Sequence, residues 1–456
     1  MYTGFIRVPM FTFSLSFFYS IFWGLYTQSM ENIAISSAQQ PFVRNRFTWL
    51  SYLLLAAYCY LQVSPGSIVP FLHAEMHLNY TIDSLHVSSL AMGIILSGLC
   101  GDRIAQRIGR QLMLWLCVTG IALGGILLML AHHPLVSISG ILCIGFFGCT
   151  LSNIVQSALS DYYGSQRTIA ITEANTIACL GSVTGPIVLG LFLSTWLGWR
   201  AMFLVPLVMM ALLACFFHDV RLPVSARVEH SQTTRTRAHF SRASWFYLGV
   251  MVMVVAFEWG TFTWGSGYLI KIVGFETRTA STLMSLFFFA EMFGRFIGSI
   301  LTRRFSADQL LVVALGIAGT GFLLFWLGPT PILHVLGLFV AGLGIGNLFP
   351  LTFTIVLNEG ADNTDAAAAR SSLAAGLAIF IAPLLLGRAA DIFGLRTSYS
   401  LVMILFVLAC IMLVFARQAT HKKQATPLEL EIEQFLHEQA RPLDEVIPSL
   451  DLTSVS

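Results

Sequence analysis

Long runs of apolar residues, separated by short polar segments, dominate the chain from Trp49 to Ala416. A helix needs about 20 predominantly apolar residues to cross the roughly 30 Å hydrocarbon core of a bilayer. Twelve runs approach or exceed that length: 48–72, 84–100, 111–132, 135–158, 168–195, 200–218, 244–271, 279–302, 308–328, 331–358, 366–390 and 396–416. Backbone amides in lipid must be hydrogen-bonded within the protein, so each run is predicted to be a helix. The pattern predicts an all-α integral membrane protein with twelve transmembrane helices.

The first six predicted helices resemble the last six. GPIVLG followed by GWR in the fifth is matched by APLLLG followed by GLR in the eleventh. Pro186 therefore corresponds to Pro383 and Gly190 to Gly387, each pair 197 residues apart. A repeat of this length predicts two six-helix bundles that use the same unit twice.

Polar segments separate and flank these two bundles. The predicted domains are an N-terminal extension (1–47), a first bundle (48–218), a basic linker (219–243), a second bundle (244–416) and a tail (417–456). The apolar stretch 8–28 can be a signal-like segment, a thirteenth helix, or sequence upstream of a start at Met30. In the tail, Thr426 and Pro427 match an N-cap and a first-turn proline, which predicts a short amphipathic helix.

Positive charge is concentrated on one side of this topology. With the first helix starting inside, the inside loops hold seventeen Lys and Arg residues and the outside loops hold five. The positive-inside rule then places the linker, the tail and both ends of the twelve-helix unit in the cytoplasm. Only 11% of the residues are charged, against about 25% in soluble domains, which excludes an ordinary soluble protein. Lys plus Arg (25) nearly equals Asp plus Glu (23), so no nucleic-acid partner is expected.

No residue spacing indicates a metal, a cofactor or an enzyme active site. The eight cysteines fall singly in apolar runs and are interpreted as small core residues. The sequence has no GxxxxGK[ST] loop, histidine cluster or nucleophile elbow. His73, His132 and His133 are expected to be solvated near the outer surface, and Asp391 is expected to be a loop or latch charge.

Three ionisable residues fall in the middle of predicted membrane helices. An ionisable group at that depth costs roughly 2.5 to 3.5 kcal/mol unless it is paired or hydrated. Glu258 has no partner in its own helix, which favours a cavity-facing, proton-exchanging carboxylate; pairing to another helix is the alternative. Glu291 and Arg295 are four residues apart on one helix face, so they can be a neutral structural pair or part of proton coupling.

Uncharged polar residues near mid-membrane supply candidate substrate ligands beside Glu258. Tyr58, Gln62 and Asn347 lie on polar helix faces, although single polar residues in membrane helices more often link helices. Trp264, close to Glu258 in sequence, can stack on a flat or sugar-like solute, with ordinary packing as the alternative.

Between the second and third predicted helices the chain reads GLCGDRIAQRIGRQ. This segment resembles the signature loop of the major facilitator superfamily, a Gly, three residues, Asp-Arg and then Gly-Arg. The matching residues are Gly98, Asp102, Arg103, Gly109 and Arg110. The resemblance implies a latch in one state of a transport cycle, in which Gly98 lets helices approach closely; a plain positive anchor is the alternative. Two extra residues before Gly109 depart from the signature and leave the partner of Arg110 open.

A second segment, GSVTGPIVLG, resembles the glycine-rich motif in the fifth helix of the family's proton antiporters. Gly181, Gly185 and Gly190 lack side-chain bulk and Pro186 lacks an amide hydrogen, so the helix is predicted to bend against its neighbour. The motif's last Gly-Gly is Leu-Gly here, and the fourth helix lacks the arginine that drug exporters usually carry.

The family resemblance implies a secondary active transporter that moves a small organic solute across the cytoplasmic membrane by alternating access. Glu258, Glu291 and Arg295 are the expected proton-coupling residues. The expected partners are the solute, a proton or another ion, and the lipid bilayer, with the protein a monomer. Uptake symport and efflux antiport both remain open. The alternative from another class is a membrane receptor or scaffold on a transporter fold.

Overall fold

The computed structural model describes residues 42–223, 241–302, 304–359 and 364–439. The chain divides into two compact units, Met1–Asn45 and Arg46–Ser456, and all the described helices belong to the second unit. The apolar stretch 8–28, the centre of the basic linker and the end of the tail lie outside the described residues.

The first half of this unit contains six membrane-spanning segments. Its elements are α2 (Arg46–Gln62), α3 (Ser64–Met76), α4 (Tyr80–Leu96), η1 (Ser97–Gly101), α5 (Asp102–Ile108), α6 (Arg110–Leu130), α7 (Pro134–Tyr163), η2 (Gly164–Gln166), α8 (Arg167–Phe192), η3 (Trp199–Phe203) and α9 (Leu204–Phe217). The predicted first helix is divided into α2 and α3 at Val63, because Pro65 in the first turn of α3 has no amide to donate to the preceding turn.

The second half repeats this plan. Its elements are α10 (Arg242–Thr263), α11 (Gly265–Tyr268), η5 (Leu269–Val273), α12 (Thr277–Leu301), α13 (Ala307–Leu327), α14 (Pro331–Glu359), α15 (Thr364–Phe393) and α16 (Leu395–Gln439). The predicted seventh helix is likewise divided, here into α10, α11 and η5. Within the described residues, twelve segments are long and apolar enough to cross a membrane. The predicted all-α class with twelve transmembrane helices is confirmed.

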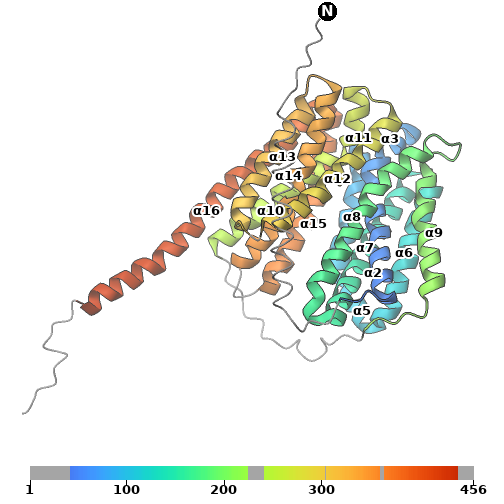
Figure 1. Ribbon diagram of the computed structural model, residues 1–456. Helices are drawn as coiled ribbons and strands as arrows, with labels where there is room; N and C mark the ends of the chain where they lie inside the picture. The colour runs from blue at the N-terminus through green and yellow to red at the C-terminus, as the bar shows by residue number, and fades with distance from the viewer. Residues whose placement is uncertain (1–41, 224–240, 303, 360–363, 440–456) are drawn as a thin grey trace, which may run out of the picture. The chain divides into compact units, whose positions relative to one another are not determined.

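The last helix differs from its prediction. α16 runs from Leu395 to Gln439 without a break, so a separate tail helix starting at Thr426 is wrong. The stretch after Arg417 contains no glycine and many Lys, Gln, Glu and Leu residues, which favour helix. These residues outweigh the missing amide of Pro427. Figure 1 shows the helix projecting far past the other helices.

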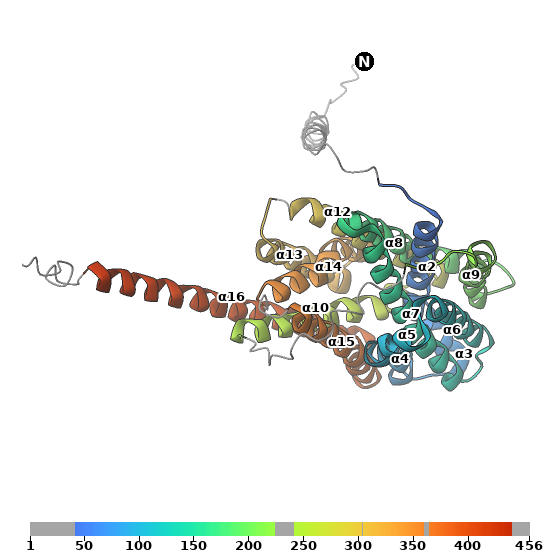
Figure 2. The ribbon, with the colours of Figure 1, turned by 90° about the horizontal axis from the view of Figure 1, so that it is seen from below.

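The helices of the two halves form two groups that lie side by side (Figures 1 and 2). Two helix pairs form the largest contacts between the halves: α4 packs on α15, and α8 packs on α12. Within the first half, α6 packs on α7 and α2 packs on α8. Within the second half, α13 packs on α14 and α10 packs on α16.

Equivalent glycines of the internal repeat lie in these two large contacts. A methyl group on Gly387 of α15 would lie 1.9 Å from Oγ of Ser84 in α4. A methyl group on Gly190 of α8 would lie 2.1 Å from Oγ1 of Thr282 in α12. Both glycines therefore hold the halves in direct contact. We call the end of the unit that contains these contacts the closed end.

Candidate functional site

A charged cluster joins the two halves near the middle of the spans. Glu291 and Arg295 of α12 form an ion pair, consistent with their spacing of four residues. Nε of Arg295 also donates to the carbonyl oxygen of Gly346 in α14, at 3.0 Å. Its Nη1 lies 3.8 Å from Sγ of Cys179 in α8. The guanidinium group therefore connects three helices and both halves.

Close packing of α12 on α14 brings the Gly346 carbonyl within reach of Arg295. A methyl group on Gly346 would lie 2.3 Å from the carbonyl oxygen of Glu291. One on Gly294 would lie 2.2 Å from the carbonyl oxygen of Leu343. Side chains at these two positions would force the helices apart.

Glu258 of α10 completes the cluster. Its side chain is half-buried, and it makes no hydrogen bond or ion pair with any described residue. It interacts electrostatically with both Glu291 and Arg295. The structure therefore brings the three mid-membrane charges together, and Glu258 is the acid that no basic side chain contacts.

Two cysteines also lie beside the charged cluster. The sequence predicts that both are small core residues without a functional contact. Cys179 contacts Arg295, and Cys59 of α2 interacts electrostatically with Arg295 and Glu291. Sγ of Cys59 also donates to Oε1 of Gln62, at 3.9 Å. The sequence around a single cysteine in an apolar run does not predict such a contact. For Cys59, the neighbouring polar residues Tyr58 and Gln62 indicate a polar helix face.

The other predicted ligands are placed differently. Tyr58 of α2 is 5% exposed, and its ring fills the space beside Gly148, where a methyl group would lie 2.0 Å from Cε2. Nδ2 of Asn347 donates to the carbonyl oxygen of Gly294 at 2.7 Å, which links α14 to α12. Tyr58 and Gln62 flank Cys59, which interacts electrostatically with the cluster, and neither side chain hydrogen-bonds to another described helix.

Trp264 lies away from the cluster, at the closed end. It is 3% exposed and packs edge-on against Tyr80, with ring centroids 5.2 Å apart. Its Nε1 is buried without a hydrogen-bond partner among the described residues.

The signature loop packs within the first half. Nη1 of Arg110 pairs with Oδ2 of Asp161 in α7 at 2.6 Å, which identifies the partner that the sequence left open. Gly109 has a φ of +90°, a conformation that favours glycine because it has no Cβ. The loop therefore joins α6 to α7.

Around Gly98 the loop makes no close approach to another helix, whereas a methyl group on Gly101 would lie 2.8 Å from Oγ1 of Thr150 in α7. A methyl group on Gly98 would meet nothing within 4 Å, so the expected tight packing there is wrong for this arrangement. Arg103 is exposed, and the side chain of Asp102 lies outside the described residues. The two halves are held together at the opposite end, which removes the reason for close packing at Gly98.

The fifth-helix motif packs α8 against α2. A methyl group on Gly181 would lie 2.1 Å from the carbonyl oxygen of Ala56, and one on Gly185 would lie 3.4 Å from that of Tyr60. Pro186 lies inside α8.

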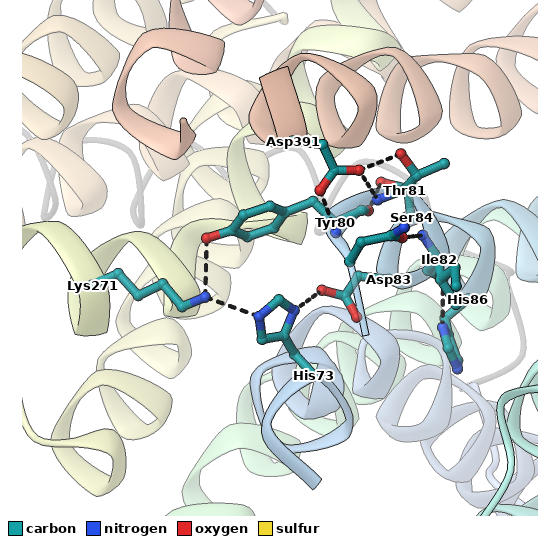
Figure 3. A network of polar contacts seen from close by, with 10 residues as sticks. His73, Tyr80, Thr81, Ile82, Asp83, Ser84, His86, Lys271 and Asp391 are labelled. Carbon is teal, nitrogen blue, oxygen red and sulfur yellow. Dashed lines mark hydrogen bonds and ion pairs between the residues drawn. The ribbon is translucent and has the colours of Figure 1, made fainter. Parts of the chain in front are cut away.

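At the closed end, Asp391 of α15 caps the first turn of α4 (Figure 3). Its Oδ1 accepts from the amide of Tyr80 at 2.8 Å, and its Oδ2 accepts from the amide of Thr81 at 2.9 Å and from Thr81 Oγ1 at 2.5 Å. The first amides of a helix have no intrahelical acceptor, so this carboxylate satisfies donors of the other half. Asp391 is thus one of the residues that hold the halves together.

The expected solvation of His73 is wrong. Its Nδ1 lies 2.5 Å from Oδ2 of Asp83, and its Nε2 lies 3.2 Å from Nζ of Lys271 in η5. Lys271 also donates to Oη of Tyr80 at 3.0 Å. Two of these partners, Asp83 and Lys271, are 10 and 198 residues from His73 in sequence, so helix periodicity gave no sign of the contacts.

Within the described residues, no group of three or more potential ligands can hold a metal ion. All eight cysteines are free thiols.

Residues 10–383 match the family model of the Major Facilitator Superfamily. The chain is 24% identical over 374 residues to the uncharacterized transporter YycB of Bacillus subtilis (strain 168), covering 78% of this chain and 88% of that protein. The fold is similar to that of a bacterial homologue of the human lysosomal transporter Spinster, with a TM-score of 0.67, 16% identity and coverage of 84% of this chain and 98% of the other. A D-xylose–proton symporter gives a TM-score of 0.65 at 16% identity, covering 81% of this chain and 96% of the other. The family match extends over most of the chain and the fold agrees with it, so this protein belongs to the Major Facilitator Superfamily and is a membrane transporter rather than an enzyme.

Proposed function

We propose that this transporter moves a small organic solute across the cytoplasmic membrane by proton-coupled alternating access between its two halves. The observation that carries the proposal is Glu258, a half-buried carboxylate that contacts no basic group among the described residues and lies beside an ion pair connecting both halves. An ionised carboxylate at this depth is unfavourable unless it is paired or hydrated. Binding a proton or another cation would neutralise the charge of Glu258.

The chemistry of the cluster links protonation to the arrangement of the halves. With both carboxylates ionised, Glu258, Glu291 and Arg295 carry a net charge of −1, and a proton on Glu258 makes the cluster neutral. Arg295 contacts α8 of one half and α14 of the other, so its contacts change when the halves move. A change of charge beside Arg295 therefore favours one arrangement over the other.

The solute site is proposed beside this cluster, between Tyr58 and Gln62 of α2 and Glu258 of α10. The ion pair neutralises Arg295, so the described residues of the proposed site offer no unpaired cation to bind an anionic solute. A neutral polar solute fits these groups best. The similarity of fold to a D-xylose–proton symporter is consistent with this class of solute.

The closed end is proposed to face the outside of the cell. The loops near Arg110 belong to the arginine-rich side, which the positive-inside rule places in the cytoplasm. The structure is then the state that is shut towards the outside. Neither uptake nor efflux is favoured by this assignment.

The test begins with purified full-length protein. A thermal-shift screen of monosaccharides starting with D-xylose, nucleosides, amino acids and carboxylic acids identifies a solute, because binding raises stability in proportion to ln(1 + [L]/Kd). Accumulation of that solute in proteoliposomes under an imposed proton gradient then measures coupling.

Glu258→Gln is expected to abolish gradient-driven accumulation, because glutamine mimics the protonated acid and cannot release a proton. Exchange of solute between the two sides is expected to continue. Glu276→Gln is the matched control, because Glu276 is exposed at the start of α12 and its side chain forms no capping bond. Undiminished accumulation by Glu258→Gln would remove this residue from the coupling mechanism.

The receptor alternative has its own test. If the unmodified protein shows no counterflow with any solute that it binds, the receptor alternative is favoured.

A further inference from the structure

His73 occupies the contact between the halves at the closed end (Figure 3). Its ring lies between a carboxylate of its own half, Asp83, and an ammonium group of the other half, Lys271. The side chain of Asp83 is only 1% exposed and that of His73 is 25% exposed. Oδ1 of Asp83 has no partner among the described residues, so His73 is the group that compensates this carboxylate directly.

The partners of His73 determine where its proton lies. Nζ of Lys271 donates to Oη of Tyr80 and lies 4.7 Å from the centroid of the Tyr80 ring, as an ammonium group does in a cation–π contact. An ammonium group can only donate, so Nε2 of His73 must accept and carries no proton. The single ring proton is then on Nδ1 and is donated to Asp83. The contacts of the closed end require a neutral His73.

A second proton on this ring would break only the contact between the halves. Protonated Nε2 would place an N–H donor and a positive charge against Lys271 at 3.2 Å. The bond from Nδ1 to Asp83 would persist, because it needs the same proton in both forms. The lost contact joins α3 of the first half to η5 of the second.

The groups that face His73 come from three elements. They are Asp83 and Tyr80 of α4, Lys271 of η5, and Asp391 of α15. The elements α2, α8, α10 and α11 also contact α3, and none of their described titratable groups interacts with His73. Glu258 of α10 interacts instead with the central cluster, and Tyr268 of α11 donates to the carbonyl oxygen of Trp326 at 2.6 Å.

Asp391 attracts a protonated His73 but does not replace Lys271 as its partner. Both carboxylate oxygens of Asp391 are occupied by the amides of Tyr80 and Thr81.

We propose that His73 is a second proton-binding site of the transporter, separate from Glu258, and that a proton bound there opens the closed end. This inference rests on the proposed function in one respect: it takes the opening of the closed end to be a step of transport.

The direction of the effect follows from the protonation states. The closed arrangement binds no proton at Nε2, whereas in the open arrangement Nε2 is free of Lys271 and can bind one, as an ordinary imidazole does at about pH 6.5 and below. The open arrangement therefore binds more protons, and lowering the pH shifts the population towards it. Most of this shift is expected between about pH 5 and pH 7.

The experiment measures the width of the closed end directly. Spin labels are attached to Ala74→Cys on α3 and Glu276→Cys at the start of α12, both exposed positions, in full-length protein whose native cysteines are replaced. Pulsed electron spin resonance in lipid nanodiscs then gives the distance distribution at about pH 8 and about pH 5.5. We expect a short distance at the higher pH and a longer distance at the lower pH.

His73→Gln is expected to remove this shift, because glutamine donates and accepts hydrogen bonds but does not take up a proton in this range. Lys271→Gln is expected to remove it as well, because protonated His73 then meets no positive charge. His132→Gln, the same substitution at an exposed histidine on another loop, is expected to keep the full shift. A full shift in both His73→Gln and Lys271→Gln, or no shift in the unsubstituted pair, would overturn the proposal.

Glu258→Gln separates this inference from the proposed function. It is expected to keep the pH-dependent change of distance while losing gradient-driven accumulation. If Glu258→Gln loses the shift and His73→Gln keeps it, the inference is overturned and the role of Glu258 stands. If Glu258→Gln keeps both the shift and full accumulation, the inference stands and the proposed coupling role of Glu258 falls.

Discussion

Arg295 shows how one side chain can serve structure and function at once. Its side chain is 41% exposed although it lies midway along a membrane helix, and its guanidinium group contacts residues of both halves. A cation at this depth needs either a counter-ion or water. Glu291 is the counter-ion, so the pair stabilises the protein while leaving part of Arg295 accessible.

Glu291→Ala is expected to destabilise the protein because it leaves Arg295 without a counter-ion. The cost should be about 1 to 3 kcal/mol, below that of a fully buried pair because the Arg295 side chain is 41% exposed. Thermal unfolding of the purified protein measures it as a lower Tm. The double substitution Glu291→Ala/Arg295→Ala should recover part of the loss, since no unpaired charge remains. A Tm unchanged by Glu291→Ala would show that the pair contributes nothing to stability.

Local spacing predicted some contacts of individual residues and missed others. The pairing of Glu291 with Arg295 followed from a separation of four residues on a helix. The partners of His73 and Cys179 could not be inferred, because Lys271 and Arg295 belong to the other half of the chain. Periodicity describes one helix at a time, whereas these contacts depend on how two helices meet.

At the scale of elements, the contacts of α4 with α15 and of α8 with α12 follow the internal repeat. Gly387 and Gly190 are 197 residues apart and occupy equivalent places in the two contacts. The oxygen that each glycine meets belongs to a hydroxyl that bonds its own helix, Ser84 to the carbonyl of Tyr80 and Thr282 to that of Arg278. The repeat seen in sequence is therefore a repeat of packing.

Gly387→Ala is expected to open the closed end at any pH. Its methyl group would lie 1.9 Å from Ser84 Oγ and 2.5 Å from the carbonyl oxygen of Tyr80, so α15 must move away from α4. The spin-label distance between positions 74 and 276 should lengthen even at about pH 8. Gly316→Ala is the control, because a methyl group on that helical glycine meets nothing within 4 Å. A short distance retained by Gly387→Ala would show that the contact can absorb a methyl group.

The sequence predicted the number of membrane-spanning helices but not the positions at which the first and seventh are divided. Apolar runs gave twelve spans because the bilayer imposes a minimum length. The breaks after Gln62 and Thr263 went unpredicted, although Pro65 and Gly265 stand beside them, because the apolar pattern continues across both positions. α16 was predicted to end too early because one N-cap pattern was given more weight than a long run of helix-forming residues.

At the scale of the whole molecule, the distribution of basic residues predicts how the protein is oriented in the membrane. Seventeen basic residues against five indicate that the linker and the loop near Arg110 are cytoplasmic. The same rule predicts that the closed end faces the outside. Sequence could not predict which end is closed, because one sequence encodes every state of the transport cycle and the states differ only in contacts between the halves.

Cysteine labelling in intact cells checks the orientation. In a background without the native cysteines, Ala74→Cys is expected to react with a membrane-impermeant thiol reagent added outside. His230→Cys in the linker is expected to react only after the cells are permeabilised. Labelling of His230→Cys in sealed cells would reverse the topology and would place the proton site at His73 on the cytoplasmic side.

Asp391 has a further consequence for the time course of opening. Three hydrogen bonds from the start of α4 end on this one carboxylate, which belongs to the other half. When α15 withdraws, all three donors lose their acceptor in the same movement and must be hydrated together. A slightly separated end would have lost these bonds without yet admitting enough water to replace them, so it lies at a maximum of free energy. Single-molecule recordings should therefore show abrupt jumps between two widths, with no dwell at intermediate values.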